Sequence, residues 1–436
     1  MVSGRAPEVG GALRIVGHAI AFGRDPDGFL ARCRHEHGDT FRLRLPTERT
    51  FVLDPLDHPA VFQSRTLSFS APALEMAGRV FGFDGEAAKR WHFDDADLSD
   101  PLKGPELALL SERVHTRLAA RLADAIGEGA SGDGLYEFLA RPAFAAGVDT
   151  LFGDGFDSDS VYRHYVHLDR FFPLVAAGLP PALIPGFRAA QRALAAASAP
   201  ARPGRARVFE ARAAHFEREA IPERVRPALD AAIVWASQGN TLPTVFWSVL
   251  FAFRDPALLA LLRAEVAEHA ADGPLVDAVK KMVHLDSALS EILRWANLSM
   301  VIRRATAPTT LPLTAGGALE LGTGEEICLY ARATHMDPEI YPEPQTLRFD
   351  RFLGSPSFTR RGQRVVFPLL PFGGGAHACP GRFLARSELK LIVALLVRGY
   401  DIALDAPTIP EIDFARVGFG MPPPKKDIAF RITRRA

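Results

Sequence analysis

The sequence contains few cysteines: three among 436 residues. Cys33, Cys328 and Cys379 lie far apart along the chain, and this spacing predicts neither a disulfide framework nor a zinc site. Widely spaced free thiols suit a reducing compartment, so we expect the protein to be cytoplasmic.

An excess of charge of either sign is missing as well. The 51 basic and 51 acidic residues give a formal net charge of zero. This balance gives no reason to expect nucleic acid or an anionic membrane as the main partner. Hydrophobic residues make up 48% of the chain and charged residues 23%, which allows a large core and excludes global disorder.

The beginning of the sequence lacks a long uninterrupted apolar run. Its longest apolar run, near residues 12–22, is broken by Arg14, Gly17 and His18. We therefore expect no secretory signal and no transmembrane anchor. Phosphate-loop, dinucleotide and Gly-x-Ser-x-Gly motifs are also missing, so separate partners would have to carry flavin and nicotinamide.

The periodicity of the chain predicts one mainly α domain, residues 1–436, with a minor β-sheet region. Strand-like runs occur at residues 40–45 and 50–53, and a longer β-like stretch covers 302–329. Helical patterns cover residues 105–274, 284–295 and 382–398, with breaks near 130–134, 178–186 and 199–204. We find no internal repeat and no charged linker.

The segment Phe-Gly-Gly-Gly-Ala-His-Ala-Cys-Pro-Gly, residues 372–381, is the most informative one. It places Cys379 directly before an apolar helical stretch, where backbone N–H groups and the helix dipole favour a thiolate. Its glycines let the backbone approach a flat, bulky group closely. An isolated Cys-Pro-Gly would more often be a buried structural cysteine, but the surrounding ten residues favour a functional thiol.

This segment resembles the haem-binding loop of the cytochrome P-450 superfamily, Phe-x-x-Gly-x-x-x-Cys-x-Gly. Phe372, Gly375, Cys379 and Gly381 match it position by position. The resemblance implies a cytochrome P-450 fold and haem b (iron protoporphyrin IX), with Cys379 as the axial iron ligand. It also implies that Phe372 packs near the sulfur and that His377 bonds a haem propionate.

A charged pair lies in an otherwise apolar helical run. Glu291 and Arg294 are three residues apart on one predicted face, and buried charges must be paired. The resemblance adds Arg351, in a Phe-x-Arg-Phe context, as the third member of a structural brace. It also implies a propionate contact from Arg303, which we prefer over its neighbour Arg304.

The resemblance also identifies the helix that would cover the distal face of the haem. Most of the superfamily carries an acid and an alcohol there, which deliver protons during dioxygen reduction; this sequence has Gly239 and Asn240, with Thr241 one place beyond. We expect Asn240, Thr241 and ordered water to manage protons. Pro243 predicts a kink that frees the Gly239 carbonyl. The competing interpretation is a helix kink lined by core residues.

The run 235–243, with Phe246-Trp247, resembles the group that contains cholesterol 7-alpha-hydroxylase, sterol 12-alpha-hydroxylase and prostacyclin synthase. By resemblance, the chain is a soluble, bacterial member that hydroxylates a steroid-, terpenoid- or lipid-like substrate with dioxygen. Electrons would come from a ferredoxin or flavodoxin-type donor. The residues that family position places in the substrate pocket are Val234, Ala236, Ser299, Met300, Val301 and Phe419.

Two other functions compete with hydroxylation. A P-450-type isomerase or dehydratase would rearrange a peroxide without external electrons, and the Gly239-Asn240 pair fits that reaction equally well. A haem-based sensor or ligand carrier is the non-catalytic alternative, although the sequence shows no output module.

Overall fold

The computed structural model describes residues 2–13, 16–45, 47–91, 98–271 and 273–435. Helices dominate, as the sequence predicts. They are α1 (Ala19–Arg24), α2 (Pro26–His37), α3 (His58–Gln63), α4 (Ser70–Phe81), α5 (Gly85–Ala88), α7 (Gly104–Ile126), α8 (Leu135–Phe152), α9 (Ser158–Ala176), α10 (Phe187–Ser198), α11 (Val208–Arg218), α12 (Arg226–Gln238), α13 (Thr241–Arg254), α14 (Pro256–His269), α15 (Leu275–Lys281), α16 (Val283–Ala296), α17 (Ala331–His335) and α18 (Arg382–Gly399).

The strands are short and form four small sheets. They are β1 (Val2–Gly4), β2 (Thr40–Leu45), β3 (Thr47–Val52), β4 (Leu67–Ser68), β5 (Gly129–Gly132), β6 (Met300–Ala305), β7 (Thr309–Pro312), β8 (Gly317–Leu321), β9 (Glu326–Tyr330), β10 (Thr359–Arg360), β11 (Gln363–Arg364), β12 (Tyr400–Asp405) and β13 (Ala429–Arg434). The largest sheet has the order β2-β3-β9-β6-β4. It joins the two strands predicted near residue 45 to the predicted β-like stretch 302–329, because β3 and β9 pair in parallel.

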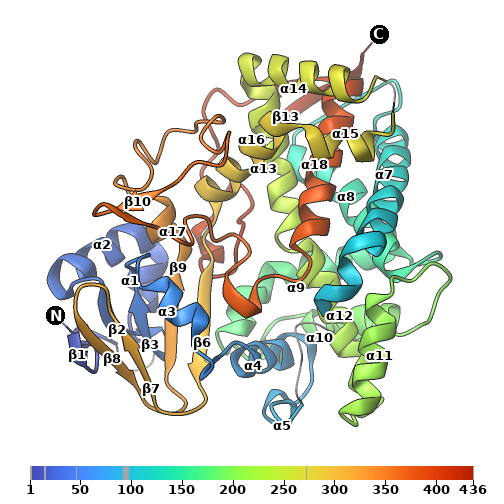
Figure 1. Cartoon of the computed structure of the whole chain (residues 1–436). Coiled ribbons are helices and arrows are strands. Elements are labelled where there is room, and N and C mark those ends of the chain that lie inside the picture. Colours follow the sequence, from blue (N-terminus) through green and yellow to red (C-terminus); the bar gives the residue numbers. More distant parts are fainter. Residues whose placement is uncertain (1, 14–15, 46, 92–97, 272, 436) are drawn as a thin grey trace.

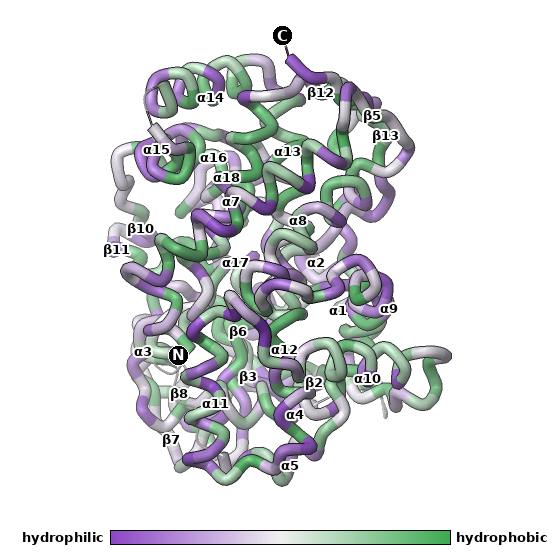
Figure 2. The backbone as a smooth tube through the Cα atoms, turned by 90° about the vertical axis from the view of Figure 1, so that its right-hand side faces the viewer, coloured by the Kyte–Doolittle hydropathy of each residue, from purple (hydrophilic) through white to green (hydrophobic). Residues whose placement is uncertain are grey.

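The helices and the largest sheet occupy different parts of the molecule (Figure 1). The sheet lies beside α1, α2 and α3, while the long helices α7, α8, α13 and α18 pack against one another on the other side. Residues 241–252 of α13 are all buried, which marks it as the central helix of the core. Figure 2 shows α13 running through the helical part as a mostly hydrophobic segment.

No single helix among the described residues is long and apolar enough to cross a membrane. Segments 226–254 and 256–269 together have the length and the apolar composition of a membrane span, but they bend by 103° at their junction.

Two histidines, His58 and His335, are fully buried, which generates a stability prediction. Burial lowers the pKa of His58 to about 4, and burial with the nearby Arg294 and Arg332 charges lowers that of His335 to about 3, from the ordinary 6.5. The His335 Nε2 accepts a hydrogen bond from the Leu370 N–H at 2.9 Å. Both side chains are therefore neutral in the folded protein.

We expect the contribution of these two histidines to stability to be fully present above about pH 6.5 and to fall as the pH falls, because the unfolded chain then binds protons that the folded one rejects. His335 alone should cost about 2 kcal/mol of unfolding free energy between pH 7 and pH 5. Chemical denaturation at both pH values measures this loss. The His335→Gln variant keeps an acceptor for Leu370 and should show a weaker loss; an equal loss in both proteins would contradict the assignment.

Candidate active site

Cys379 ends the glycine-rich loop 372–381 and lies directly before α18. Its N–H donates to the Phe372 carbonyl at 2.8 Å, and the Arg382 guanidinium donates to the Cys379 carbonyl at 2.9 Å. The helix begins at Arg382, as the apolar periodicity predicts. The loop thus folds back on itself and presents its thiol beside the first turn of the helix.

Two glycines of this loop let α3 approach it closely. A Cβ on Gly374 would lie 2.8 Å from the Phe62 ring, and a Cβ on Gly375, where φ is +68°, would lie 2.8 Å from the Phe62 carbonyl oxygen. The sequence analysis expected the glycines of this loop to admit a flat, bulky group. At Gly374 and Gly375, the group that approaches closely is Phe62. Gly381 has open space beside it, so it leaves room next to Cys379.

A cavity of about 250 Å³ lies between this loop and the α12–α13 segment. Its lining is mostly apolar and includes Leu98, Leu102, Val114, Leu151, Val208, Ile233, Ala236, Leu293, Pro371, Phe372, Leu384, Leu389 and Met421. Ala236 of α12 and Asn240, between α12 and α13, are exposed although this segment crosses the core, because both line this cavity.

The residues around this cavity fit a flat, apolar group that is ligated through sulfur. Cys379 and Glu388 are the ionisable side chains of the lining, and no group of three or more His, Cys, Asp or Glu that could hold a bare metal ion occurs within the described ranges. A single thiol in an apolar cavity suits a haem iron, whose other ligands come from the porphyrin.

The acidity of the Cys379 thiol differs from the sequence prediction. Burial raises its pKa above the ordinary value, while the backbone N–H groups of Gly381 and Arg382 and the Arg382 charge lower it. The helix terminus thus acts in the predicted direction, but burial outweighs it in the protein alone. A bound cation reverses this balance, because a coordinating thiol is deprotonated outright.

Arg303 lies beside the loop. It is 3% exposed, its guanidinium donates to the Gly374 carbonyl at 3.3 Å, and it lies 5.8 Å from the Phe62 ring centroid. Arg304 points elsewhere, because it pairs with Glu75 and Glu326. Of these two arginines, the structure therefore brings Arg303 to the loop.

The other candidate propionate contact, His377, is half-buried and ends the turn Gly375–His377 of the same loop. Trp91, in the early segment where the sequence shows no propionate-binding pattern, is buried against Leu74, Phe216 and Leu229. The propionate-binding roles of Arg303 and His377 stay predictions.

The structure brings Glu291, Arg294 and Arg351 together in the core. The Arg294 guanidinium donates to both carboxylate oxygens of Glu291 at 2.8 Å, and the Arg351 Nε lies 3.2 Å from each. Glu291 and Arg294 are fully buried and Arg351 is 9% exposed. The third Arg294 nitrogen, Nη1, donates to the His335 carbonyl at 2.7 Å, which ties α16 to α17.

Asn240 lies between two helices and faces the cavity. α12 ends at Gln238 and α13 begins at Thr241, two residues before Pro243. The Asn240 Oδ1 accepts a hydrogen bond from the Met421 N–H at 2.8 Å. Because the oxygen is engaged by a backbone donor, the amide nitrogen is the end that can serve a ligand.

Of the two residues next to Asn240, Thr241 lines the cavity and Gly239 does not. Thr241 lines the cavity, and its hydroxyl donates to the Ser237 carbonyl at 2.7 Å. Gly239 is buried and absent from the cavity lining; a Cβ there would lie 3.0 Å from the Trp235 ring. Its predicted catalytic contribution is therefore limited to its backbone.

The predicted substrate-pocket residues do not converge on one surface. Ala236 lines the cavity beside Cys379. Phe419 packs edge-on against Phe172, with ring centroids 5.4 Å apart, and Phe172 stacks on Trp235 at 3.7 Å.

The remaining pocket candidates belong to other packing groups. Val234 is fully buried in the main core cluster, and Val301 packs in the cluster beside the sheet with Phe62. Met300 packs against a third cluster, and Ser299 bridges Gly418 through its backbone. None of these four residues belongs to the described lining of the cavity at Cys379, and their contact with a substrate stays a prediction.

Sequence reasoning missed two residues of this region, Met421 and Glu388. The contact between Met421 and Asn240 joins segments 181 residues apart, and no local pattern predicts it. Glu388 did leave a signal, because it is an acid on the apolar face of α18, one turn after Leu384.

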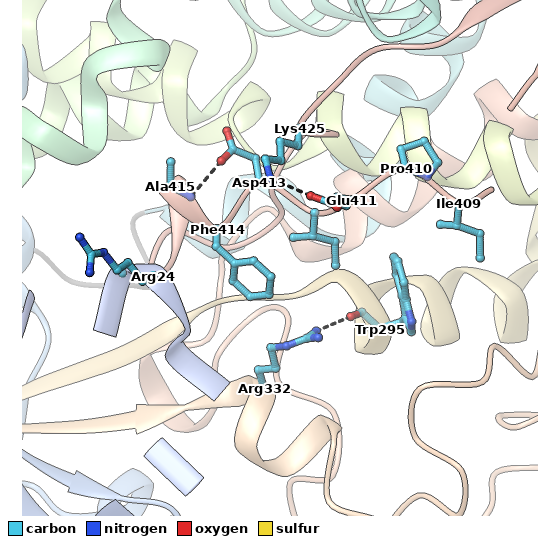
Figure 3. A pocket seen from close by; sticks show the side chains of 12 residues that line it. Arg24, Trp295, Arg332, Ile409, Pro410, Glu411, Asp413, Phe414, Ala415 and Lys425 are labelled. Atoms are coloured by element: carbon cyan, nitrogen blue, oxygen red, sulfur yellow. Dashed lines mark hydrogen bonds and ion pairs between the residues drawn. The ribbon is translucent and has the colours of Figure 1, made fainter. Parts of the chain in front are cut away.

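A second hollow opens at the surface between α1, α16, α17 and the segment 409–415 (Figure 3). It has a volume of about 610 Å³ and shares no described lining residue with the cavity at Cys379. Its Arg332 donates to the Trp295 carbonyl at 2.7 Å, and its Lys425 pairs with Glu411 at 2.7 Å. These charges are already engaged, so the hollow does not compete with the cavity as the reaction site.

Known proteins resemble this chain along its whole length. A family model described as Cytochrome P450 matches residues 228–430. The chain is 28% identical to 7-alpha-hydroxycholest-4-en-3-one 12-alpha-hydroxylase of Homo sapiens and 29% identical to prostacyclin synthase of Bos taurus. Each match covers 97% of this chain, and the matches cover 91% and 92% of those proteins.

A solved structure of retinoic acid-bound cyanobacterial CYP120A1 superposes with a TM-score of 0.74. It is 17% identical, and the match covers 100% of both chains. This likeness shows the fold.

The Glu291 brace generates a stability prediction. In a Glu291→Ala variant, two buried guanidinium groups lose their carboxylate, and we expect a loss of about 3–5 kcal/mol of unfolding free energy. Denaturant titration measures it, with Glu112→Ala on the exposed face of α7 as the control. A loss below about 1 kcal/mol, the size typical of a surface pair, would contradict the brace.

Proposed function

We propose that the chain is a cytochrome P450 monooxygenase and that it hydroxylates a lipophilic substrate of steroid, terpenoid or lipid type. Electrons would come from a separate ferredoxin or flavodoxin-type donor. The observation that carries the proposal is the apolar cavity between Cys379 and the α12–α13 segment. The cytoplasmic location belongs to the same proposal.

The residues around the cavity would have different roles in such a site. Bound haem b would supply dioxygen activation and substrate oxidation. Cys379 would hold it through sulfur, while Arg303 and His377 would bind its propionates. Asn240 would orient an oxygen or a water through its amide nitrogen, and Thr241 would take part in proton transfer.

The substrate class rests on two supports. The cavity lining is mostly hydrophobic, which suits a molecule with little polar surface. Two of the relatives are named for sterol-type substrates, a 12-alpha-hydroxylase and a cholesterol 7-alpha-monooxygenase, each 28% identical to this chain.

Peroxide isomerisation is the second candidate function. Gly239 and Asn240 place no acid at the position where the superfamily usually has one, and an isomerase needs no protons for dioxygen reduction. The 29% identity to prostacyclin synthase supports this alternative.

The consumption of reductant separates the two functions. With a substrate that shifts the haem spectrum, the purified protein and a reconstituted electron donor should consume dioxygen and reductant in proportion to hydroxylated product. A panel of steroids, terpenoids and fatty acids provides that substrate. Turnover of a lipid endoperoxide without reductant, and no hydroxylation of any panel member, would instead favour the isomerase.

The amide nitrogen of Asn240 provides a sharper test of the distal side. An Asn240→Asp variant keeps an oxygen for the Met421 N–H but replaces the donating amide nitrogen. We expect product formation to fall on the order of 100-fold, the cost typical of losing one donor at a reacting oxygen. Asn240→Ala, which also loses the Met421 bond, serves as the comparison. Wild-type product yield in the Asp variant would show that the donor is not used.

A further inference from the structure

A buried arginine near the end of the chain has two nitrogen atoms without hydrogen-bond partners. Arg416 ends the turn Phe414–Arg416 and is 6% exposed. One of its nitrogens, Nη1, pairs with the carboxylate of Asp169 on α9. Its Nε and Nη2 are also buried, and within the described structure neither of them reaches an acceptor. A buried N–H group without an acceptor costs free energy, so these two groups call for one.

Asp169 neutralises the charge of Arg416 but leaves those two donors unused. Its Oδ2 pairs with Arg416 Nη1, and its Oδ1 accepts a hydrogen bond from the Trp235 indole N–H at 2.8 Å. Tyr136 and Tyr165 also act on Arg416, and burial, together with the Asp169 charge, raises the pKa of both hydroxyls. Both tyrosines are therefore uncharged, and the formal net charge of the whole group is zero.

Two stretches of chain connect this group to the cavity at the thiol. On α12, Trp235 holds Asp169 through its indole, and the next residue, Ala236, lines the cavity. The segment that begins at Arg416 reaches Met421, which also lines the cavity. The ion pair is thus tied to the cavity wall from two directions.

An aromatic stack packs beside the ion pair. The Trp235 ring lies flat on the Phe172 ring, with centroids 3.7 Å apart, and the half-buried Phe419 meets Phe172 edge-on at 5.4 Å. Flat apolar faces of this kind suit the skeleton of a lipophilic molecule. A polar group next to such a stack matches a lipophilic molecule that carries an oxygen atom.

The zero net charge of the pair decides which kind of oxygen fits. A keto or hydroxyl oxygen accepts hydrogen bonds from Nε and Nη2 without bringing a charge. A carboxylate adds a second negative charge to an arginine that Asp169 has already neutralised, and burying an unpaired charge is costly. A hydrocarbon leaves both donors without an acceptor.

We infer that Arg416 is a specificity-determining residue that donates hydrogen bonds to a keto or hydroxyl oxygen of the substrate, and that Asp169 positions it. The site thereby selects an oxygenated lipophilic molecule over the hydrocarbon of the same skeleton and over its carboxylic acid. This inference rests on the proposed function, because it names the substrate class of the same site.

Equilibrium dialysis of the haem-loaded protein tests this selection without turnover. The probes are tritium-labelled androstane, androstanone and androstane carboxylate, with the oxygen at either end of the ring system. A double variant, Arg416→Met with Asp169→Asn, removes the donors and leaves no buried charge unpaired. It should bind androstane as the wild type does and androstanone on the order of 10- to 100-fold more weakly, the size of a hydrogen bond from a charged donor.

Arg212→Lys is the matched control for the double variant. Arg212 is 5% exposed and pairs with Asp230 at 2.9 Å, but it also donates to the Leu229 carbonyl at 2.8 Å. This control should leave the ratio of the two affinities unchanged. The same ratio in the double variant, as expected if water alone uses the donors, would overturn the inference, and so would a wild-type protein that binds no androstanone.

Asp169→Asn tests the charge argument. The amide keeps an oxygen as an acceptor but removes the negative charge, so the Arg416 charge is no longer neutralised. The affinity for androstane carboxylate should then rise at least about tenfold relative to androstanone. A folded variant without this gain would show that the pair does not choose between the two oxygens.

Infrared spectroscopy of the wild type covers the case in which the variants fail to fold. The C=O band of bound androstanone should lie below its frequency in a hydrocarbon solvent, because a charged donor polarises the carbonyl. An unshifted band would overturn the inference. Reductant consumption decides the proposed function, and binding needs no turnover, so the two can fail separately.

Discussion

The buried Glu291 carboxylate is the interaction on which the rest of the structure depends. Arg294 from its own helix, Arg351 and the Arg348 N–H, at 3.0 Å, converge on its oxygens in a part of the core with no access to water. A charge in such a place is stable only while every partner stays, so the network fixes the positions of α16 and the segment around Arg351 together. Arg294 extends this network to α17, because it also donates a hydrogen bond to the His335 carbonyl. The His335 ring in turn accepts a hydrogen bond from the backbone N–H of Leu370, which lies just before the Cys379 loop. The position of the thiol is thus set by contacts made far from it.

The two sides of the cavity obey different physical constraints. On the loop side, burial raises the pKa of the Cys379 thiol in the protein alone, and coordination to a cation would reverse this effect. On the helix side, the break between α12 and α13 presents an amide whose oxygen is engaged by Met421. No ionisable group of α12–α13 lines the cavity, and the one buried acid that does, Glu388, comes from the helix that follows the thiol.

Local pattern predicted the elements, residue chemistry paired Glu291 with Arg294, and the family resemblance added Arg351, but long-range contacts decided the details of the site. The apolar periodicity predicted α18 at residues 382–398, and the structure has it at Arg382–Gly399. The need to pair buried charges placed Glu291 and Arg294 correctly together. The bond between Asn240 and Met421, and the close approach of Phe62 to Gly374, join segments that no local period connects. The sequence indicated the backbone N–H groups that lower the pKa of the thiol, but not the burial that raises it, because burial cannot be read from a loop sequence.

The absorption spectrum of the ferrous carbonyl complex tests the central claim most directly, namely that Cys379 binds haem iron as a thiolate. The protein reconstituted with haem b should show the red-shifted Soret band of thiolate ligation, and Cys379→Ala should lose that band. A wild-type spectrum without the red shift, or a red-shifted band that persists in Cys379→Ala, would contradict the account of the site.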